Sequence, residues 1–117
     1  MSDSDTIMVD SLFPLRPVSD QELRSRFEPY RQCAESGELA VTLLEPSDKL
    51  APPTAEQVPG TLSQMVSYRQ HDCDNELARA HRYVRPDGTL GGSGKPDPKL
   101  VLQDGILYGQ RRKRQLI

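Results

Sequence analysis

Apolar residues recur at helical spacing in one early segment of the chain. In residues 19–37, the side chains of Leu23, Phe27, Tyr30 and Ala34 fall on one face of an α-helix. The segment therefore predicts an amphipathic helix that turns this face toward a core.

The ends of this helix carry signals of their own. Ser19 and Glu22 have the capping-box spacing, in which each side chain accepts a hydrogen bond from a free backbone N–H. Gly37 stands where a left-handed cap would close the helix. Pro29 removes one hydrogen bond from the helix interior, so we expect a kink or a break near Arg26–Glu28.

The remainder of the chain follows the period of β-strands. Residues 39–44 alternate in a strand pattern, and residues 63–71 and 76–84 flank a polar turn at Asp72–Asn75. Asp104-Gly105 separates two apolar triplets, which is the strongest short-range signal for a hairpin. The apolar positions of Leu62–Tyr68 also fit a helix, and that alternative stays open.

Together these elements predict an α+β fold, with one kinked N-terminal helix packed on a small antiparallel sheet arranged as a meander. We expect a flexible or extended arm at residues 1–18 and a single domain at 19–110, with a proline-rich loop at 45–60 and a basic tail at 111–117. Pro14 and Pro17 exclude helix and central strand near the end of the arm.

Composition and charge indicate the size of the core and the kind of partner that the chain is expected to bind. Leu, Ile, Val and Phe make up only 26 of the 117 residues, so the core is thin. The formal net charge of −2 divides into −7 for residues 1–74 and +5 for residues 75–117. An anionic partner is therefore expected to meet the C-terminal part.

The cysteine and histidine content argues against a metal centre. Cys33 and Cys73 are too few for a disulfide framework, and no signal or membrane-spanning segment is visible, so we expect a cytoplasmic protein. His71, Cys73 and His81 are residue types that bind zinc, but paired Cys-x-x-Cys knuckles are missing. We expect no metal and no cofactor.

A glycine-rich segment near residue 90 invites comparison with phosphate-binding loops. A Walker loop would need a glycine at Thr89 and a hydroxyl at Pro96, and the sequence has neither. Gly91, Gly92 and Gly94 with Lys95 could still hold an anion. The competing interpretation is a hairpin loop that uses glycine for positive φ angles.

One strand carries residue types that suit acid–base chemistry. His81, Tyr83 and Arg85 alternate and so share a face, and His71 could join them from the neighbouring strand. Metal-independent ribonucleases use such side chains. A small nuclease or toxin-like enzyme is therefore one alternative hypothesis, in which a His81→Ala substitution abolishes RNA cleavage.

We favour a non-enzymatic function. The thin core, extended segments and divided charge are typical of a small accessory or inhibitory protein that docks on a larger protein or nucleoprotein partner through its basic C-terminal half. The tail could also hold nucleic-acid phosphates. A structural component of a larger assembly is a further alternative, for which the isolated chain would be partly unfolded. The expected binding residues are the cations of the C-terminal half: Arg79, Arg82, Arg85, Lys95, Arg111, Arg112, Lys113 and Arg114.

Overall fold

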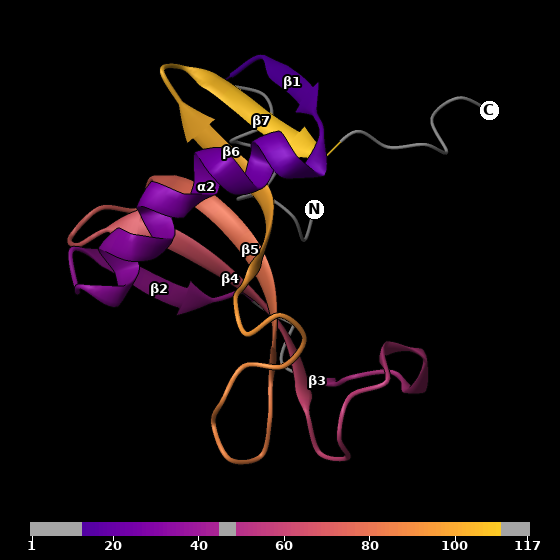
Figure 1. Ribbon diagram of the computed structural model, residues 1–117. Coiled ribbons are helices and arrows are strands. Elements are labelled where there is room, and N and C mark those ends of the chain that lie inside the picture. The colour runs from indigo at the N-terminus through magenta and orange to yellow at the C-terminus, as the bar shows by residue number, and fades with distance from the viewer. Residues whose placement is uncertain (1–12, 45–48, 111–117) are drawn as a thin grey trace, which may run out of the picture.

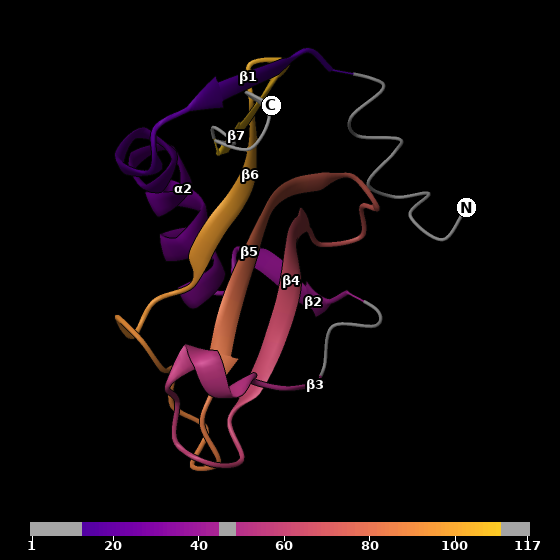
Figure 2. The same cartoon turned by 90° about the vertical axis from the view of Figure 1, so that its right-hand side faces the viewer.

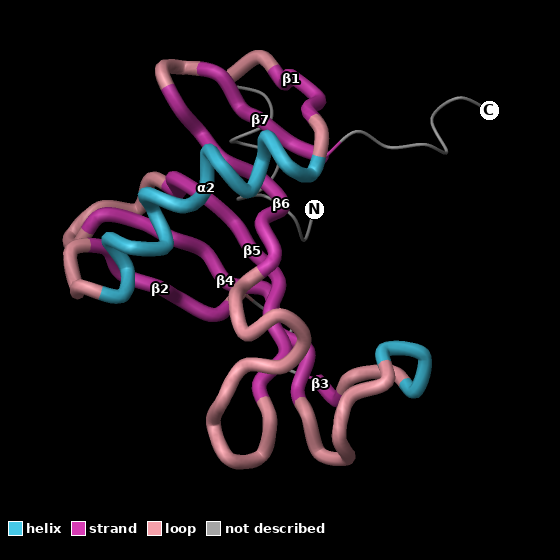
Figure 3. The backbone as a smooth tube through the Cα atoms, viewed as in Figure 1, coloured by secondary structure: helices cyan, strands magenta, loops and turns pink. Residues whose placement is uncertain are grey.

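The protein folds as one helix on a curved, mixed β-sheet (Figure 1). The structure is a computed structural model that describes residues 13–44 and 49–110. Figure 3 shows the same chain coloured by type of element. In chain order the elements are β1 (Leu15–Val18), α2 (Asp20–Glu35), β2 (Leu39–Leu43), β3 (Lys49–Leu50), the short 3-10 helix η1 (Pro53–Ala55), β4 (Leu62–Gln70), β5 (Glu76–Val84), β6 (Asp97–Gln103) and β7 (Ile106–Gln110).

The α+β prediction is confirmed, but the sheet is not antiparallel throughout. Strands β4 to β7 pair in sequence as an antiparallel meander, and β2 joins the outer side of β4. Strand β1 pairs in parallel with β7 at the opposite edge, and β3 makes a two-residue pairing with β4. Pro17 is tolerated in β1 because this is an edge strand, where a missing N–H costs no central ladder bond.

Helix α2 begins and ends as the sequence predicts. The Ser19 hydroxyl accepts a hydrogen bond from the Glu22 N–H at 3.1 Å, and Gly37 closes the helix with a φ of 89°. The expected break near Arg26–Glu28 is wrong, because α2 continues through Pro29 to Glu35. Pro29 lies on the exposed side of the helix, where water can solvate the carbonyl group that it leaves without a donor.

The core lies between α2 and one face of the sheet (Figure 2). Leu23 and Phe27 are the buried residues of the helix, and the Phe27 ring meets Tyr68 of β4 edge-to-face at 5.1 Å. Tyr30 anchors the helix further, since its hydroxyl donates a hydrogen bond to the Leu102 carbonyl at 2.8 Å. The sheet contributes Val66 and Tyr68 from β4, Ala78 and Ala80 from β5, Val101 from β6 and Tyr108 from β7.

Beyond the helix, β4 and β5 extend as a two-stranded ribbon (Figure 1). The last pair of this ribbon joins Leu62 of β4 to Val84 of β5, and β3 pairs with β4 at the same end. Strand β4 resolves the alternative for Leu62–Tyr68 in favour of a strand. The proline-rich loop contains β3 and η1, and its residues 45–48 lie outside the described residues.

Candidate anion-binding cleft

A cleft opens where β6 stops pairing with β5. The β5–β6 ladder starts at the pair His81–Asp97, whereas β5 itself continues to Val84. The connecting chain meets β5 again at the bridge between Val84 and Leu90, and the Gly91 N–H donates to the Tyr83 carbonyl at 2.9 Å. Residues 92–96, between these two contacts, make no ladder pair with β5, and a cleft of about 480 Å³ lies there.

Two backbone features shape the walls of this cleft. Gly91 is buried, and a Cβ there would lie 2.2 Å from Oε1 of Gln57, so a larger residue would require the Gln57 side chain to move. On the opposite wall the register shifts between Arg79 and Ala80, which pair with Leu100 and Pro98. Lys99 is the extra residue of this β-bulge, a feature that redirects side chains.

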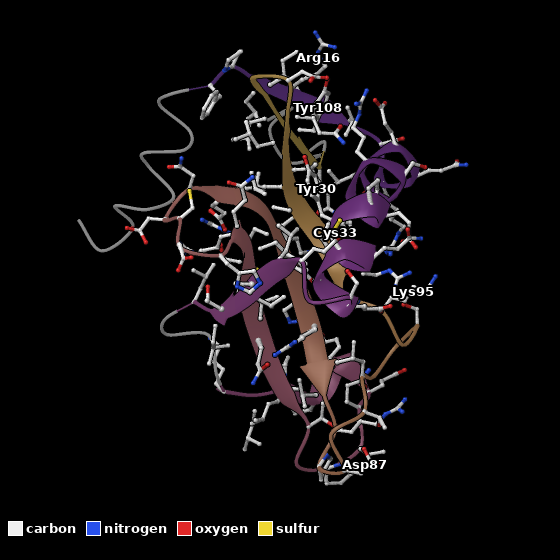
Figure 4. The ribbon with its side chains drawn as sticks, turned by 90° about the vertical axis from the view of Figure 1, so that its left-hand side faces the viewer. Arg16, Tyr30, Cys33, Asp87, Lys95 and Tyr108 are labelled. Atoms are coloured by element: carbon white, nitrogen blue, oxygen red, sulfur yellow. The ribbon has the colours of Figure 1, made fainter. Side chains whose placement is uncertain are left out.

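Basic side chains from four parts of the fold meet at the cleft. Arg24 comes from α2, Arg82 from β5, Lys95 from the β5–β6 connection and Lys99 from β6. Figure 4 labels Lys95, which lies on that connection on the side of the sheet that carries α2. Among the described residues, Asp97 is the one acidic side chain that lines the cleft. The lining therefore carries three more positive than negative charges when His81 is neutral.

Asp97 is shared between two of these cations. Its Oδ1 atom lies 2.8 Å from Nη2 of Arg24, and its Oδ2 atom lies 3.1 Å from Nζ of Lys99. The three side chains are each at least one-third exposed, so water screens both ion pairs. An anion that enters the cleft would compete with this carboxylate for both cations.

His81 and Tyr83 supply aromatic rings beside the cations. The rings meet edge-to-face with centroids 4.6 Å apart, and Nε2 of His81 is hydrogen-bonded to Oγ of Ser63 at 2.6 Å. Burial lowers the pKa of His81 below its usual value, and the nearby charge of Lys99 lowers it further, against the opposing effect of Asp97. His81 is therefore a neutral imidazole at neutral pH.

The structure brings some of the residues expected from the sequence to this cleft. Arg82 and Lys95 from the expected binding set line it, as do His81 and Tyr83 from the nuclease hypothesis. Gly91 and Gly92 line it as well, which places the glycine-rich segment beside the cations; the positive φ angles of Gly92 and Gly94 fit the hairpin-loop interpretation.

Other expected residues lie elsewhere. The guanidinium of Arg79 is paired with Glu76 (Nη2–Oε1 2.6 Å), and both side chains are almost fully buried. Arg85 contacts Thr89 in the turn after β5. His71 follows the far end of β4, where its Nε2 atom is hydrogen-bonded to the Gly37 carbonyl, so it does not meet His81. Arg111, Arg112, Lys113 and Arg114 lie outside the described residues.

Sequence reasoning missed Arg24, Asp97 and Lys99. Arg24 belongs to the polar side of an amphipathic helix, and 73 residues separate it from Asp97. The only local signal was the segment Lys95–Lys99, in which prolines alternate with charged residues beside the glycines.

Within residues 13–44 and 49–110, no group of three or more His, Cys, Asp or Glu side chains is placed to hold a metal ion. Cys33 and Cys73 are both free thiols. In the described part of the chain, no helix has the length and apolar character needed to cross a membrane. No protein-family model, curated protein sequence or solved structure matches the chain, so its function has to be argued from its own geometry.

Proposed function

We propose that this chain is a small non-enzymatic accessory protein that docks on a nucleoprotein partner by holding single-stranded nucleic acid in the cleft. The observation that carries this proposal is that four cations from separate elements line the cleft, while only one of its described lining residues, Asp97, is acidic. Guanidinium and ammonium groups are the side chains that bind phosphate most strongly.

The rest of the cleft supports single-stranded nucleic acid over an acidic protein. A volume of about 480 Å³ falls in the range of sites for small organic groups, so one nucleotide fits it by size. His81 and Tyr83 offer aromatic surface beside the phosphate-binding cations, the combination used by proteins that bind unpaired bases. An acidic peptide would use the cations but would have no need of the rings.

The direct test is fluorescence anisotropy with a labelled single-stranded RNA, a duplex DNA and an acidic peptide. We expect the RNA to bind best, with an affinity that falls as salt rises. A single nucleotide brings one or two phosphates to the cleft, so the cleft should contribute about −0.7 to −1.4 to the slope of log K against log salt concentration. A chain that ends at Gln110 separates the contribution of the tail from that of the cleft.

A matched pair of double variants locates the site. Lys95→Gln with Lys99→Gln removes two cleft cations, and Arg16→Gln with Lys49→Gln removes two cations that do not line the cleft. The cleft variant should weaken RNA binding and make the salt slope shallower by about 0.7 for each phosphate contact that is lost. Equal losses in both variants would overturn the proposal, and binding of the peptide alone would point to an acidic protein partner.

One observation keeps the nuclease hypothesis as a second candidate. His81 is neutral and lies among cations, which is the state that a general base for RNA cleavage requires. However, its Nε2 atom is engaged by Ser63, and His71 is too distant to serve as the acid. Cleavage of RNA by the full chain, abolished by His81→Ala, would favour this enzyme over the binding protein.

A further inference from the structure

Strand β2 forms one edge of the sheet, and its sequence lacks the residues that usually prevent an edge strand from pairing with another chain. In the described residues β2 pairs with β4 on one side and with no strand on the other. Its sequence, Leu-Ala-Val-Thr-Leu, contains neither a charged residue nor a proline. Val41 and Leu43 are each 38% exposed. Natural sheets usually guard such an edge with charge, proline or a bulge.

The hydrogen-bond pattern tells which backbone groups of β2 point outward. The Leu44 N–H donates to the Met65 carbonyl at 2.9 Å, next to the pair Leu43–Val66. Because residues of an antiparallel ladder alternate, Ala40 and Thr42 direct their backbone groups toward β4. The N–H and C=O groups of Leu39, Val41 and Leu43 therefore point away from the sheet, where a further strand could bind them.

These outward residues are arranged symmetrically about Val41. If a second β2 runs antiparallel to the first and is centred on Val41, then Leu39 faces Leu43 of the other copy and Val41 faces its own counterpart. All three outward residues then exchange backbone hydrogen bonds. Their side chains lie on the sheet face that packs against α2, because Val41 is paired with Tyr68 of the core.

We propose that β2 is a homodimerisation edge, where two copies of this chain pair through antiparallel β2 strands centred on Val41. A two-fold interface requires a surface that complements itself, and this strand has the same apolar pattern in both directions. No like charges are opposed within the five residues, and pairing would cover the exposed parts of Val41 and Leu43. The second edge, β1, is less suitable because Pro17 lies within it and cannot donate a hydrogen bond.

The experiment is sedimentation velocity of the full chain over a range of concentrations. We expect a monomer–dimer equilibrium. Val41→Pro should remove the dimer while the circular dichroism spectrum stays unchanged, because the Val41 N–H points outward and bonds to no strand in the described part of the monomer. Val41→Lys is the second variant, and it places like charges opposite each other at the two-fold axis. Leu50→Lys is the control at another exposed apolar residue, and it should leave the dimer intact.

Cross-linking tests the register independently. Hydrogen-bonded antiparallel partners have Cα atoms about 5.5 Å apart, within the range that a disulfide spans. With Cys33 and Cys73 replaced by serine, Val41→Cys should give a covalent dimer under mild oxidation, and Leu50→Cys should give little.

These experiments test dimerisation through β2 independently of ligand binding in the cleft. A chain that is monomeric at every concentration, or a dimer that survives both Val41→Pro and Val41→Lys, would overturn the proposal. If instead the monomer takes up an extended peptide from another protein at β2, the second copy is excluded as the occupant. The Lys95→Gln, Lys99→Gln variant should dimerise normally, so failure of RNA binding leaves this test unaffected.

Discussion

The molecule has two halves that are built differently. The packed half consists of α2 and the parts of the sheet that it covers. The cleft half consists of the β4–β5 ribbon from the Met65–His81 pair to the Leu62–Val84 pair, together with β3, η1 and the β5–β6 connection. The residues of the described apolar core all belong to the packed half. In the cleft half the fully buried positions include Thr61 and Gly91, and the side chains around the cleft are mostly polar or charged.

Because of this difference, we expect the free energy of unfolding and the affinity for a ligand to depend on different residues. Apolar burial supplies most of the favourable free energy of folding, so the packed half should determine the free energy of unfolding. Exposed ion pairs contribute little to stability, which leaves the charges that line the cleft available for a ligand. The two halves are joined through β4 and β5, which pass from the core to the cleft without interruption.

The largest effect should come from a cavity in the packed half. Leu23 of α2 is fully buried, and Leu23→Ala should lower the free energy of unfolding by about 2–5 kcal/mol. Leu50→Ala in the cleft half removes the same atoms from a residue that is 66% exposed, and should cost less than about 0.5 kcal/mol. Urea unfolding of the two variants measures both values. Similar losses would show that the cleft half contributes to stability as much as the core does.

A smaller effect on stability, with an opposite effect on binding, is expected at Asp97. Asp97→Asn removes two screened ion pairs, so stability should fall by no more than about 1 kcal/mol. The same change frees Arg24 and Lys99 for phosphate. If the two competing contacts together are worth about 1 kcal/mol, RNA affinity should rise roughly fivefold.

The matched control for this change is Asp104→Asn. Asp104 is an exposed acid in the β6–β7 turn and does not line the cleft, so its loss alters net charge equally. Anisotropy titrations at one salt concentration compare the two variants. An equal gain in both would mean that overall charge, and not release of the cleft cations, controls binding.

The elements that the sequence predicted are those set by interactions between residues close together in the chain. The helix was predicted with both ends because Ser19 and Gly37 act through neighbours within a turn. The Asp104-Gly105 hairpin was predicted because Asp and Gly tolerate the positive φ that such a turn requires. The two residues adopt φ angles of 53° and 77°. By contrast, the pairing of β1 with β7 joins Leu15 to Leu107, and no local pattern encodes so distant a partner.

The candidate site was predicted only as far as it lies on one strand. Alternation along β5 correctly placed His81 and Tyr83 together, and their rings are in contact. Arg24 and Lys99 reach Asp97 through the packing of α2 and through a β-bulge, neither of which leaves a signal in the spacing of residues. Arg79 was expected at the binding surface, but its side chain is buried in an ion pair with Glu76, which alternation along the strand does not predict.

The smallest effect expected is a pH dependence that arises in the cleft half. Burial lowers the pKa of His81 below 6.5, so the unfolded chain takes up a proton at a higher pH than the folded chain does. The free energy of unfolding should therefore be constant above about pH 6.5 and fall as the pH decreases toward the folded-state pKa. Urea unfolding at about pH 7.5 and about pH 5.5 measures this difference. His81→Gln should reduce it, whereas His71→Gln should preserve the contribution of His81.

The same histidine can report directly on the ligand. A phosphate bound beside His81 stabilises the imidazolium form, so addition of single-stranded RNA should raise the pKa of His81 in an NMR titration. The acid-induced loss of stability should shrink correspondingly, because the bound chain then holds its proton as the unfolded chain does. If the RNA binds and the pKa of His81 does not change, the phosphate lies elsewhere on the molecule and the cleft is not its site.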